Sequence, residues 1–184
     1  MTSVQELADA VRGRQARLGG IRLVCVDGPA GSGKTTLAGR LAGALDGPVI
    51  HLDDVYEGWS GLDGVEDRLL AQVIEPLAAA RPARYRRYDW VASDWAELVD
   101  VPRSDVLVIE GCGSASRRVR AFASLVLWVE APRDVRLERG LARDGEQMRD
   151  EWQRWMRGEA EHFAREGTRA AADLRVDGTA PVTP

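Results

Sequence analysis

The sequence predicts an α/β fold in which helices cover both faces of a parallel sheet, giving a three-layer α/β/α arrangement. Short segments rich in β-branched residues alternate with longer segments of helical periodicity along the chain. The first predicted strand also runs through a glycine-rich loop directly into a helix. Strands that alternate with helices in this way are typical of parallel sheets.

Length and composition indicate one domain over residues 1–184. A chain of 184 residues falls within the ~100–200 residues usual for one domain. The net charge of −4 and the interspersed signs offer no basic surface for nucleic acid. Apolar runs are far shorter than the ~20 residues that cross a bilayer, and the N-terminus is unlike a secretory signal. We therefore expect a cytoplasmic protein without nucleic-acid or membrane partners, in which Cys25 and Cys112 are packed thiols.

The elements follow in order from the N-terminus. Apolar residues at helical spacing predict a helix within residues 1–19, which Gly19-Gly20 ends. Strands are then expected at 21–27, 49–52, 105–110, 124–129 and 173–176, and helices at 34–45, 64–80, 133–143 and 146–166. The last helix carries a stripe expected to face the core: Met148, Trp152, Trp155, Met156 and Phe163.

A phosphate-binding motif lies between the first predicted strand and the next helix. Its pattern is glycine, four free positions, then Gly-Lys-Ser/Thr. The candidate nucleotide-binding residues are Gly28, Ala30, Gly31, Ser32, Gly33, Lys34, Thr35 and Thr36. Glycines permit backbone angles that aim successive N–H groups inward, and the helix N-terminus adds a positive end. Lys34, the only lysine of the chain, supplies a compact charge, and Thr35 supplies a hydroxyl for Mg²⁺.

Acidic residues follow two of the other predicted strands. Asp53 and Asp54 come directly after strand 49–52, at the edge where ligands bind in open α/β sheets. A carboxylate there can accept or orient the proton of an attacking hydroxyl. Asp53 is the preferred candidate, with a helix cap or turn as the alternative. Glu110 ends strand 105–110 and resembles a Walker-B residue that holds a Mg²⁺-bound water or a substrate hydroxyl.

Arginines in the segment 133–146 are candidates for contacting phosphates. Arg136, Arg139 and Arg143 share one helical face. A lid that carries them could close over the site and stabilise charge on the transferring phosphoryl group. Arg139 and Arg143 are favoured, and the alternative is an ordinary solvated face of an arginine-rich protein.

Aromatic residues gather between the second and third predicted strands. Residues 54–100 include Tyr56, Tyr88 and Trp90. Aromatic faces with a few polar groups would suit a base or a sugar ring. The same side chains could instead pack the edge of the sheet.

On these motifs the chain resembles the uridine kinase-like group of P-loop small-molecule kinases, in the wider set that includes phosphoribulokinase and pantothenate kinase. The resemblance rests on residues 27–36, Asp53-Asp54-Val55-Tyr56, Tyr85 to Trp90, Ile109-Glu110-Gly111 and residues 136–144. It implies a P-loop NTPase fold with five parallel strands in the order 2-3-1-4-5 and an acceptor site within 54–100. It also implies a catalytic aspartate at Asp53 and lid arginines at Arg139 and Arg143. Gly140 stands where such nucleoside kinases often have a second arginine.

The sequence thus favours a kinase that uses ATP and Mg²⁺ to phosphorylate a hydroxyl of a small, nucleoside-like metabolite. A GTPase is excluded, because guanine recognition by Asn-Lys-x-Asp needs an asparagine and a second lysine that the chain lacks. The expected roles are charge neutralisation by Lys34, Arg139 and Arg143, Mg²⁺ binding by Thr35 and Glu110, and acceptor contacts by Asp53, Glu110, Tyr56, Tyr88 and Trp90. Open alternatives are a sugar-acid, shikimate-like or nucleoside-monophosphate acceptor, and a non-catalytic ATP-binding regulator.

Overall fold

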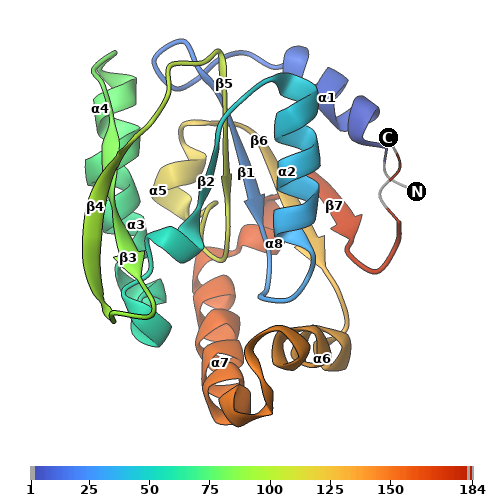
Figure 1. The fold of residues 1–184 in the computed structure, drawn as a ribbon. Coiled ribbons are helices and arrows are strands. Elements are labelled where there is room, and N and C mark those ends of the chain that lie inside the picture. The colour runs from blue at the N-terminus through green and yellow to red at the C-terminus, as the bar shows by residue number, and fades with distance from the viewer. Residues whose placement is uncertain (1–2, 182, 184) are drawn as a thin grey trace.

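A five-stranded parallel sheet forms the centre of the molecule. The computed structural model describes residues 3–181 and 183. The strand order is β2-β5-β1-β6-β7 (Figure 1). The strands are β1 Arg22–Asp27, β2 Val49–His51, β5 Val106–Glu110, β6 Ala123–Glu130 and β7 Leu174–Asp177. Counted among themselves in chain order these strands run 2-3-1-4-5, so the predicted α/β fold class and strand order are confirmed.

The sheet is buried on both faces, which explains its apolar runs. β5 is buried throughout, and β6 is buried except for Glu130. Continuous apolar strands are expected when helices cover both faces of a parallel sheet. Successive side chains alternate between the faces. Val24 and Val26 join one hydrophobic cluster, while Leu23 and Cys25 join the other.

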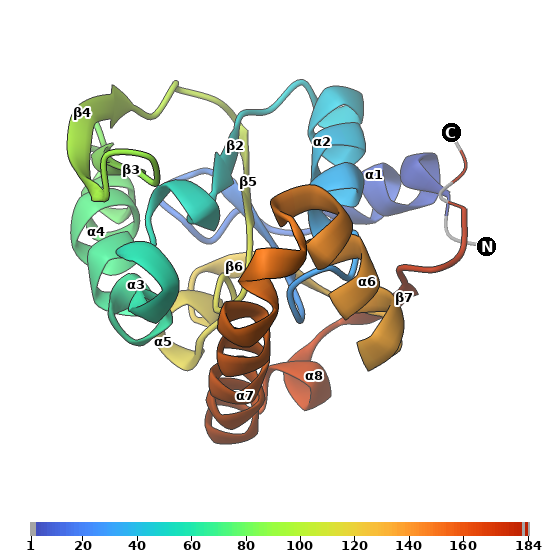
Figure 2. The same cartoon turned by 60° about the horizontal axis from the view of Figure 1, so that its bottom comes forward.

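Helices form the two outer layers (Figure 2). α1 Val4–Arg12 and α2 Lys34–Leu45 pack on one face of the sheet. α3 Leu62–Leu69, α5 Arg117–Arg120 and α7 Arg149–Glu166 pack on the opposite face. A capping box between Ser3 and Glu6 begins α1. This helix is shorter than the predicted segment: it ends at Arg12, before Gly13, a residue type that is unfavourable inside a helix.

The predicted helix at 64–80 is a helical stretch with one wider turn. α3 passes into a π-helical turn at Leu70–Ile74 and then into α4 Glu75–Ala78. Val73, Ile74 and Leu77 remain buried through the change of pitch. The turn therefore preserves the contact of this stretch with the core.

A β-hairpin at 84–100 is absent from the sequence-based prediction. β3 Arg84–Asp89 pairs antiparallel with β4 Asp94–Asp100, and the register shifts between Arg86 and Tyr88. Tyr85 and Tyr88 are both buried, although strict alternation would place them on opposite faces. The irregular register breaks the period-two pattern by which a strand is recognised.

Two helices lie at the carboxyl edge of the sheet, the lower edge in Figure 1. α6 Arg133–Asp144 and α7 confirm the two helices predicted near the C-terminus, and a 3₁₀ turn at Glu146–Met148 precedes α7. The last helix, α8 Thr168–Ala171, leads into β7. Among the helices of the described residues, none has the length and apolarity to cross a membrane.

Candidate nucleotide and acceptor site

The phosphate loop connects β1 to α2 and depends on its glycines. Gly28, Gly31 and Gly33 have φ angles of 140°, 77° and 98°. Residues other than glycine rarely adopt such angles. Space is equally restrictive, because a Cβ at Gly28 would lie 2.1 Å from the Val129 carbonyl oxygen. The loop leads into the first turn of α2, where free N–H groups and the helix dipole favour an anion.

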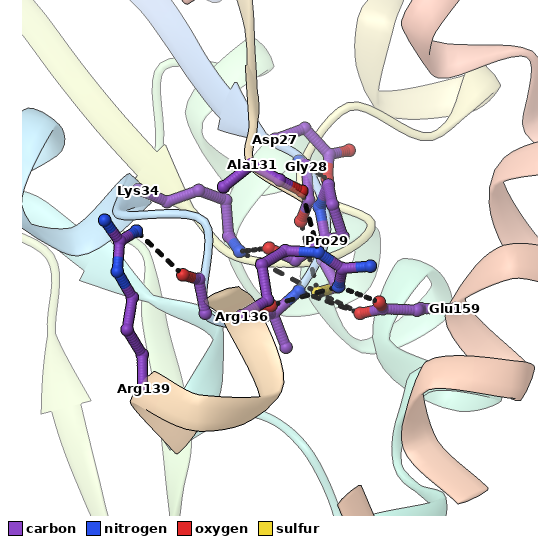
Figure 3. Close-up of polar contacts among 11 residues, drawn as sticks. Asp27, Gly28, Pro29, Lys34, Ala131, Arg136, Arg139 and Glu159 are labelled. Atoms are coloured by element: carbon purple, nitrogen blue, oxygen red, sulfur yellow. Dashed lines mark hydrogen bonds and ion pairs between the residues drawn. The ribbon is translucent and has the colours of Figure 1, made fainter. Parts of the chain in front are cut away.

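Lys34 is buried at the start of α2. Its Nζ donates to the Pro29 carbonyl oxygen at 2.9 Å and lies 3.9 Å from the Sγ of Cys112 (Figure 3). Burial lowers the pKa of the Lys34 ammonium, but Cys112, Glu110 and the other acidic groups around it outweigh this effect and raise the pKa above its ordinary value. The ammonium therefore stays charged, as phosphate binding requires.

Thr35 and Glu110 meet at the carboxyl edge of the sheet. The Thr35 hydroxyl donates to Glu110 Oε1 at 3.0 Å, and His51 Nδ1 lies 2.7 Å from the same oxygen. This bond to Glu110 raises the pKa of His51, against the effect of burial. A hydroxyl and a carboxylate side by side are oxygen ligands suited to Mg²⁺, which commonly completes its shell with waters and nucleotide phosphates. The pair therefore fits the predicted cation.

Asp53 and Asp54 lie in a 3₁₀ turn, Leu52–Asp54, directly after β2. Both line a cavity of about 500 Å³ that Lys34, Thr35 and Glu110 also line. Withdrawal from bulk water raises the pKa of the Asp53 carboxyl, and the charge of Glu110 adds to the shift. A carboxylate with a raised pKa is better matched to proton transfer near neutral pH.

Aromatic side chains form the far wall of this cavity. They are Tyr56, Trp59, Trp90, Trp152 and Trp155. Trp90 comes from the hairpin, and its Nε1 donates to the Asp53 carbonyl oxygen at 2.8 Å. Trp59 makes edge-to-face contacts with Trp90 on one side and with Trp152 and Trp155 of α7 on the other. The stripe predicted on α7 is buried at Trp152, Trp155 and Met156, and it also walls the cavity.

The three aromatic residues predicted to contact the acceptor differ in their position relative to the cavity. Tyr56 and Trp90 line the cavity, and the Tyr56 hydroxyl donates to the Cys112 carbonyl oxygen at 2.8 Å. Tyr88 lies outside the lining, where its ring packs edge-to-face on Trp90 and Trp95. Tyr88 therefore supports the wall rather than facing the cavity.

The arginines of α6 also take different positions. Arg139 donates to the carbonyl oxygens of Gly31 and Gly178 at 3.2 and 3.1 Å. Arg143 Nε lies 2.7 Å from Asp144 Oδ1, and the guanidinium group lies over the Trp152 ring. Both line a second cavity of about 510 Å³, together with Thr36 and the turn after β7. Arg139 and Arg143 thus flank the phosphate loop.

Two buried carboxylates at the phosphate loop are absent from the sequence-based prediction. Asp27, the last residue of β1, accepts from the N–H groups of Gly28, Gly113 and Ala115. Burial raises its pKa to about 6, although these N–H groups act in the opposite direction. Glu159 of α7 accepts from the Ala30 N–H at 2.8 Å. A charged residue at core spacing within the apolar stripe of α7 was the available signal for Glu159.

Together the glycine loop, its lysine and the strand-end acids define a P-loop nucleotide-binding protein. The chain belongs to the AAA domain family, whose model matches residues 24–163. A cytidylate kinase from Haloarcula marismortui is 35% identical over 124 residues, which cover 66% of this chain. The matched region is 58% of the length of that relative.

Solved structures share the fold. A structure described as a possible uridine kinase, from Bacillus stearothermophilus, has a TM-score of 0.70 at 21% identity and covers 95% of this chain and 97% of its own. A proposed fructose transport system kinase from Silicibacter sp. has a TM-score of 0.63 at 22% identity, with coverages of 96% and 100%. The resemblance to uridine kinase-like P-loop proteins is thus confirmed at the level of the fold.

Proposed function

We propose that the protein is a kinase that transfers the γ-phosphoryl group of ATP to a hydroxyl of a small, ring-bearing metabolite. One observation carries the proposal: a single cavity joins the phosphate loop residues Lys34 and Thr35, the carboxylate of Asp53 and an aromatic wall. Nucleotide phosphates and an acceptor ring can therefore lie on either side of Asp53.

We assign to Asp53 the role of the base that accepts the hydroxyl proton. The acceptor oxygen would form a bond to the γ-phosphorus as the bond from that phosphorus to the β–γ bridging oxygen breaks. The hydroxyl proton would pass to the Asp53 carboxylate, and ADP would leave. The loop N–H groups, Lys34 and the arginines Arg139 and Arg143 would hold the phosphates and offset their charge. Mg²⁺ held through Thr35 and Glu110 would supply further charge neutralisation when bound.

The charges around the cavity favour an acceptor without a phosphate or carboxylate of its own. Within the described lining of the cavity the cations are Lys34 and Arg143. Both are assigned to the phosphates of the nucleotide, and Arg143 is also paired with Asp144. A nucleoside monophosphate, sugar acid or shikimate-like acceptor would place its anion near Asp53 and Asp54 with no free cation to bind it. The cytidylate kinase relative nevertheless makes a nucleoside monophosphate the second candidate.

Asp53→Ala tests the proposal, and Asp54→Ala serves as the matched control. The purified protein is mixed with MgATP and a panel of nucleosides, sugars and nucleoside monophosphates, and phosphorylated product is measured. We expect Asp53→Ala to lower kcat about 10²–10⁴-fold, the usual contribution of a positioned base, without loss of ATP binding. Asp54→Ala should retain most of the activity. An active Asp53→Ala variant would refute the mechanism, and ATP binding without any product would favour a non-catalytic regulator.

A further inference from the structure

A buried ion pair lies behind the phosphate loop. Arg136 of α6 and Glu159 of α7 are 9% and 1% exposed, and their Nη1 and Oε1 atoms are 2.6 Å apart (Figure 3). Both side chains point toward the loop rather than into the acceptor cavity. Buried pairs of this kind are costly to desolvate, so they carry weak evidence for a role in stability alone.

The pair holds both polar groups of one residue of the loop. Glu159 Oε2 accepts from the Ala30 N–H at 2.8 Å, and Arg136 Nη1 donates to the Ala30 carbonyl oxygen at 3.1 Å. Arg136 Nε also donates to the Ala131 carbonyl oxygen at 3.2 Å, which anchors the guanidinium to the end of β6. The orientation of the Ala30 peptides is therefore set by two helices.

The backbone of α6 also contacts the loop directly. A Cβ at Gly31 would lie 2.5 Å from the Arg136 carbonyl oxygen. The loop is thus enclosed between α6 and α7, and a shift of either helix would move the N–H groups that bind phosphate.

The charge of Arg136 matters as much as its contacts. The carboxylate of Glu159 lies close enough to Lys34 to help raise the pKa of that ammonium. Left unpaired, this carboxylate would also oppose the binding of a polyanion to the adjacent loop. Arg136 cancels this charge, so the pair can hold the loop without repelling a nucleotide.

We propose that Arg136 and Glu159 form a neutral clamp that holds the phosphate loop in its anion-binding conformation. Both are positioning residues. Arg136 does not bind phosphate, in contrast to the role assigned to Arg139 and Arg143. The clamp also links the two halves of the site, because α7 carries Trp152 and Trp155 of the acceptor wall. This assignment rests on the proposed nucleotide site.

Glu159→Gln tests the clamp with the smallest change of shape. Both carboxylate oxygens face donors, the Ala30 N–H and the Arg136 guanidinium, so a glutamine must turn its NH₂ group against one of them. We expect the affinity for ATP, measured by calorimetry, to fall at least ten-fold. Glu166→Gln is the matched control, because Glu166 ends the same helix and accepts from the Arg117 N–H. The control should leave the affinity for ATP unchanged.

The double variant Arg136→Met/Glu159→Met separates loop positioning from stability. Replacing a buried ion pair by apolar side chains of similar volume is often neutral or stabilising. The variant should therefore stay folded, with Tm lowered only by the loss of the bonds to Ala30 and Ala131. The affinity for ATP should still fall at least ten-fold, because Ala30 loses both partners. Wild-type affinity in Glu159→Gln or in the double variant would overturn the clamp. A wild-type protein that fails to bind ATP would overturn the proposed function and the clamp together.

Discussion

At the scale of single residues, Lys34 shows why a lysine stands in a chain otherwise built with arginine. Its side chain is 6% exposed, and its ammonium fits between the Pro29 carbonyl oxygen and Cys112. A compact ammonium can reach between phosphate oxygens there, whereas the planar guanidinium group is broader and has fixed donor directions.

Lys34→Arg should therefore abolish turnover while leaving the fold intact. The guanidinium keeps the positive charge but cannot occupy the narrow space that Lys34 fills. Product formation from MgATP and a competent acceptor measures the effect, and thermal unfolding confirms that the variant is folded. Activity close to that of the wild type would contradict the role assigned to Lys34.

The pH dependence of the reaction reports on Asp53. Removal from bulk water, followed by the charge of Glu110, raises its pKa. Because the ionised carboxylate is the base, activity should fall as the pH falls through this raised value. The acid limb of kcat/KM for the acceptor, measured at saturating MgATP, should lie above the ordinary pKa of an aspartate, about 3.9. An acid limb at or below that value would exclude Asp53 as the base in this environment.

Sequence reasoning found the residues that face the site more readily than those that support it. Lys34, Asp53 and Glu110 sit in recognisable positions, at a loop or a strand end, and the structure brings them to one cavity. Asp27 and Glu159 act through backbone N–H groups of distant segments. Such partners depend on which loops the fold brings together, so no local pattern specifies them.

At the scale of elements, the spacing between α6 and α7 depends on Gly140. A Cβ at this position would lie 2.3 Å from the Trp152 ring. This contact leaves no room for a side chain at position 140 while Trp152 keeps its place. Trp152 in turn donates to Asp144 at 2.9 Å and lines the cavity, so the helix contact also shapes the acceptor wall.

Gly140→Ala should destabilise the protein by about 1–3 kcal/mol, the usual cost of overpacking a filled contact. Gly158→Ala is the matched control, because a Cβ at this exposed position on α7 meets nothing within 4 Å. The control should stabilise the protein by about 0.5–1 kcal/mol, since alanine is the better helix former. Urea unfolding measures both free energies. Equal effects of the two substitutions would contradict the packing role of Gly140.

The elements themselves differ in how far the sequence specified them. Strands β1, β5 and β6 could be predicted because each is a short, mostly apolar run. The pattern is weaker in β7, where two of the four residues are charged and only Val176 is buried. The hairpin could not be predicted, because its irregular register removes the alternation around Tyr85 and Tyr88. The π-helical turn at Leu70–Ile74 is equally hidden, since its residues keep a pattern that also suits an α-helix.

At the scale of the whole molecule, the sheet topology explains why the site lies where it does. Strand β1 pairs with β5 on one side and with β6 on the other, so the connections diverge at its carboxyl end. Ligands of open α/β sheets bind at such a switch point. The phosphate loop follows β1, Asp53 and Asp54 follow β2, Glu110 ends β5, and α6 follows β6. Distant parts of the sequence therefore meet at one edge.

The most direct measurement of the central claim follows the γ-phosphate of ATP. Labelled ATP is incubated with the wild-type protein, Mg²⁺ and the acceptor panel, and the label is separated into inorganic phosphate and organic product. Direct transfer of the phosphoryl group to a hydroxyl, with Asp53 as the base, predicts that the label appears in an organic phosphate and that a nucleoside-like alcohol is the preferred acceptor. Label found only in inorganic phosphate, or ATP left intact with every acceptor, would contradict the assignment of this protein as a kinase.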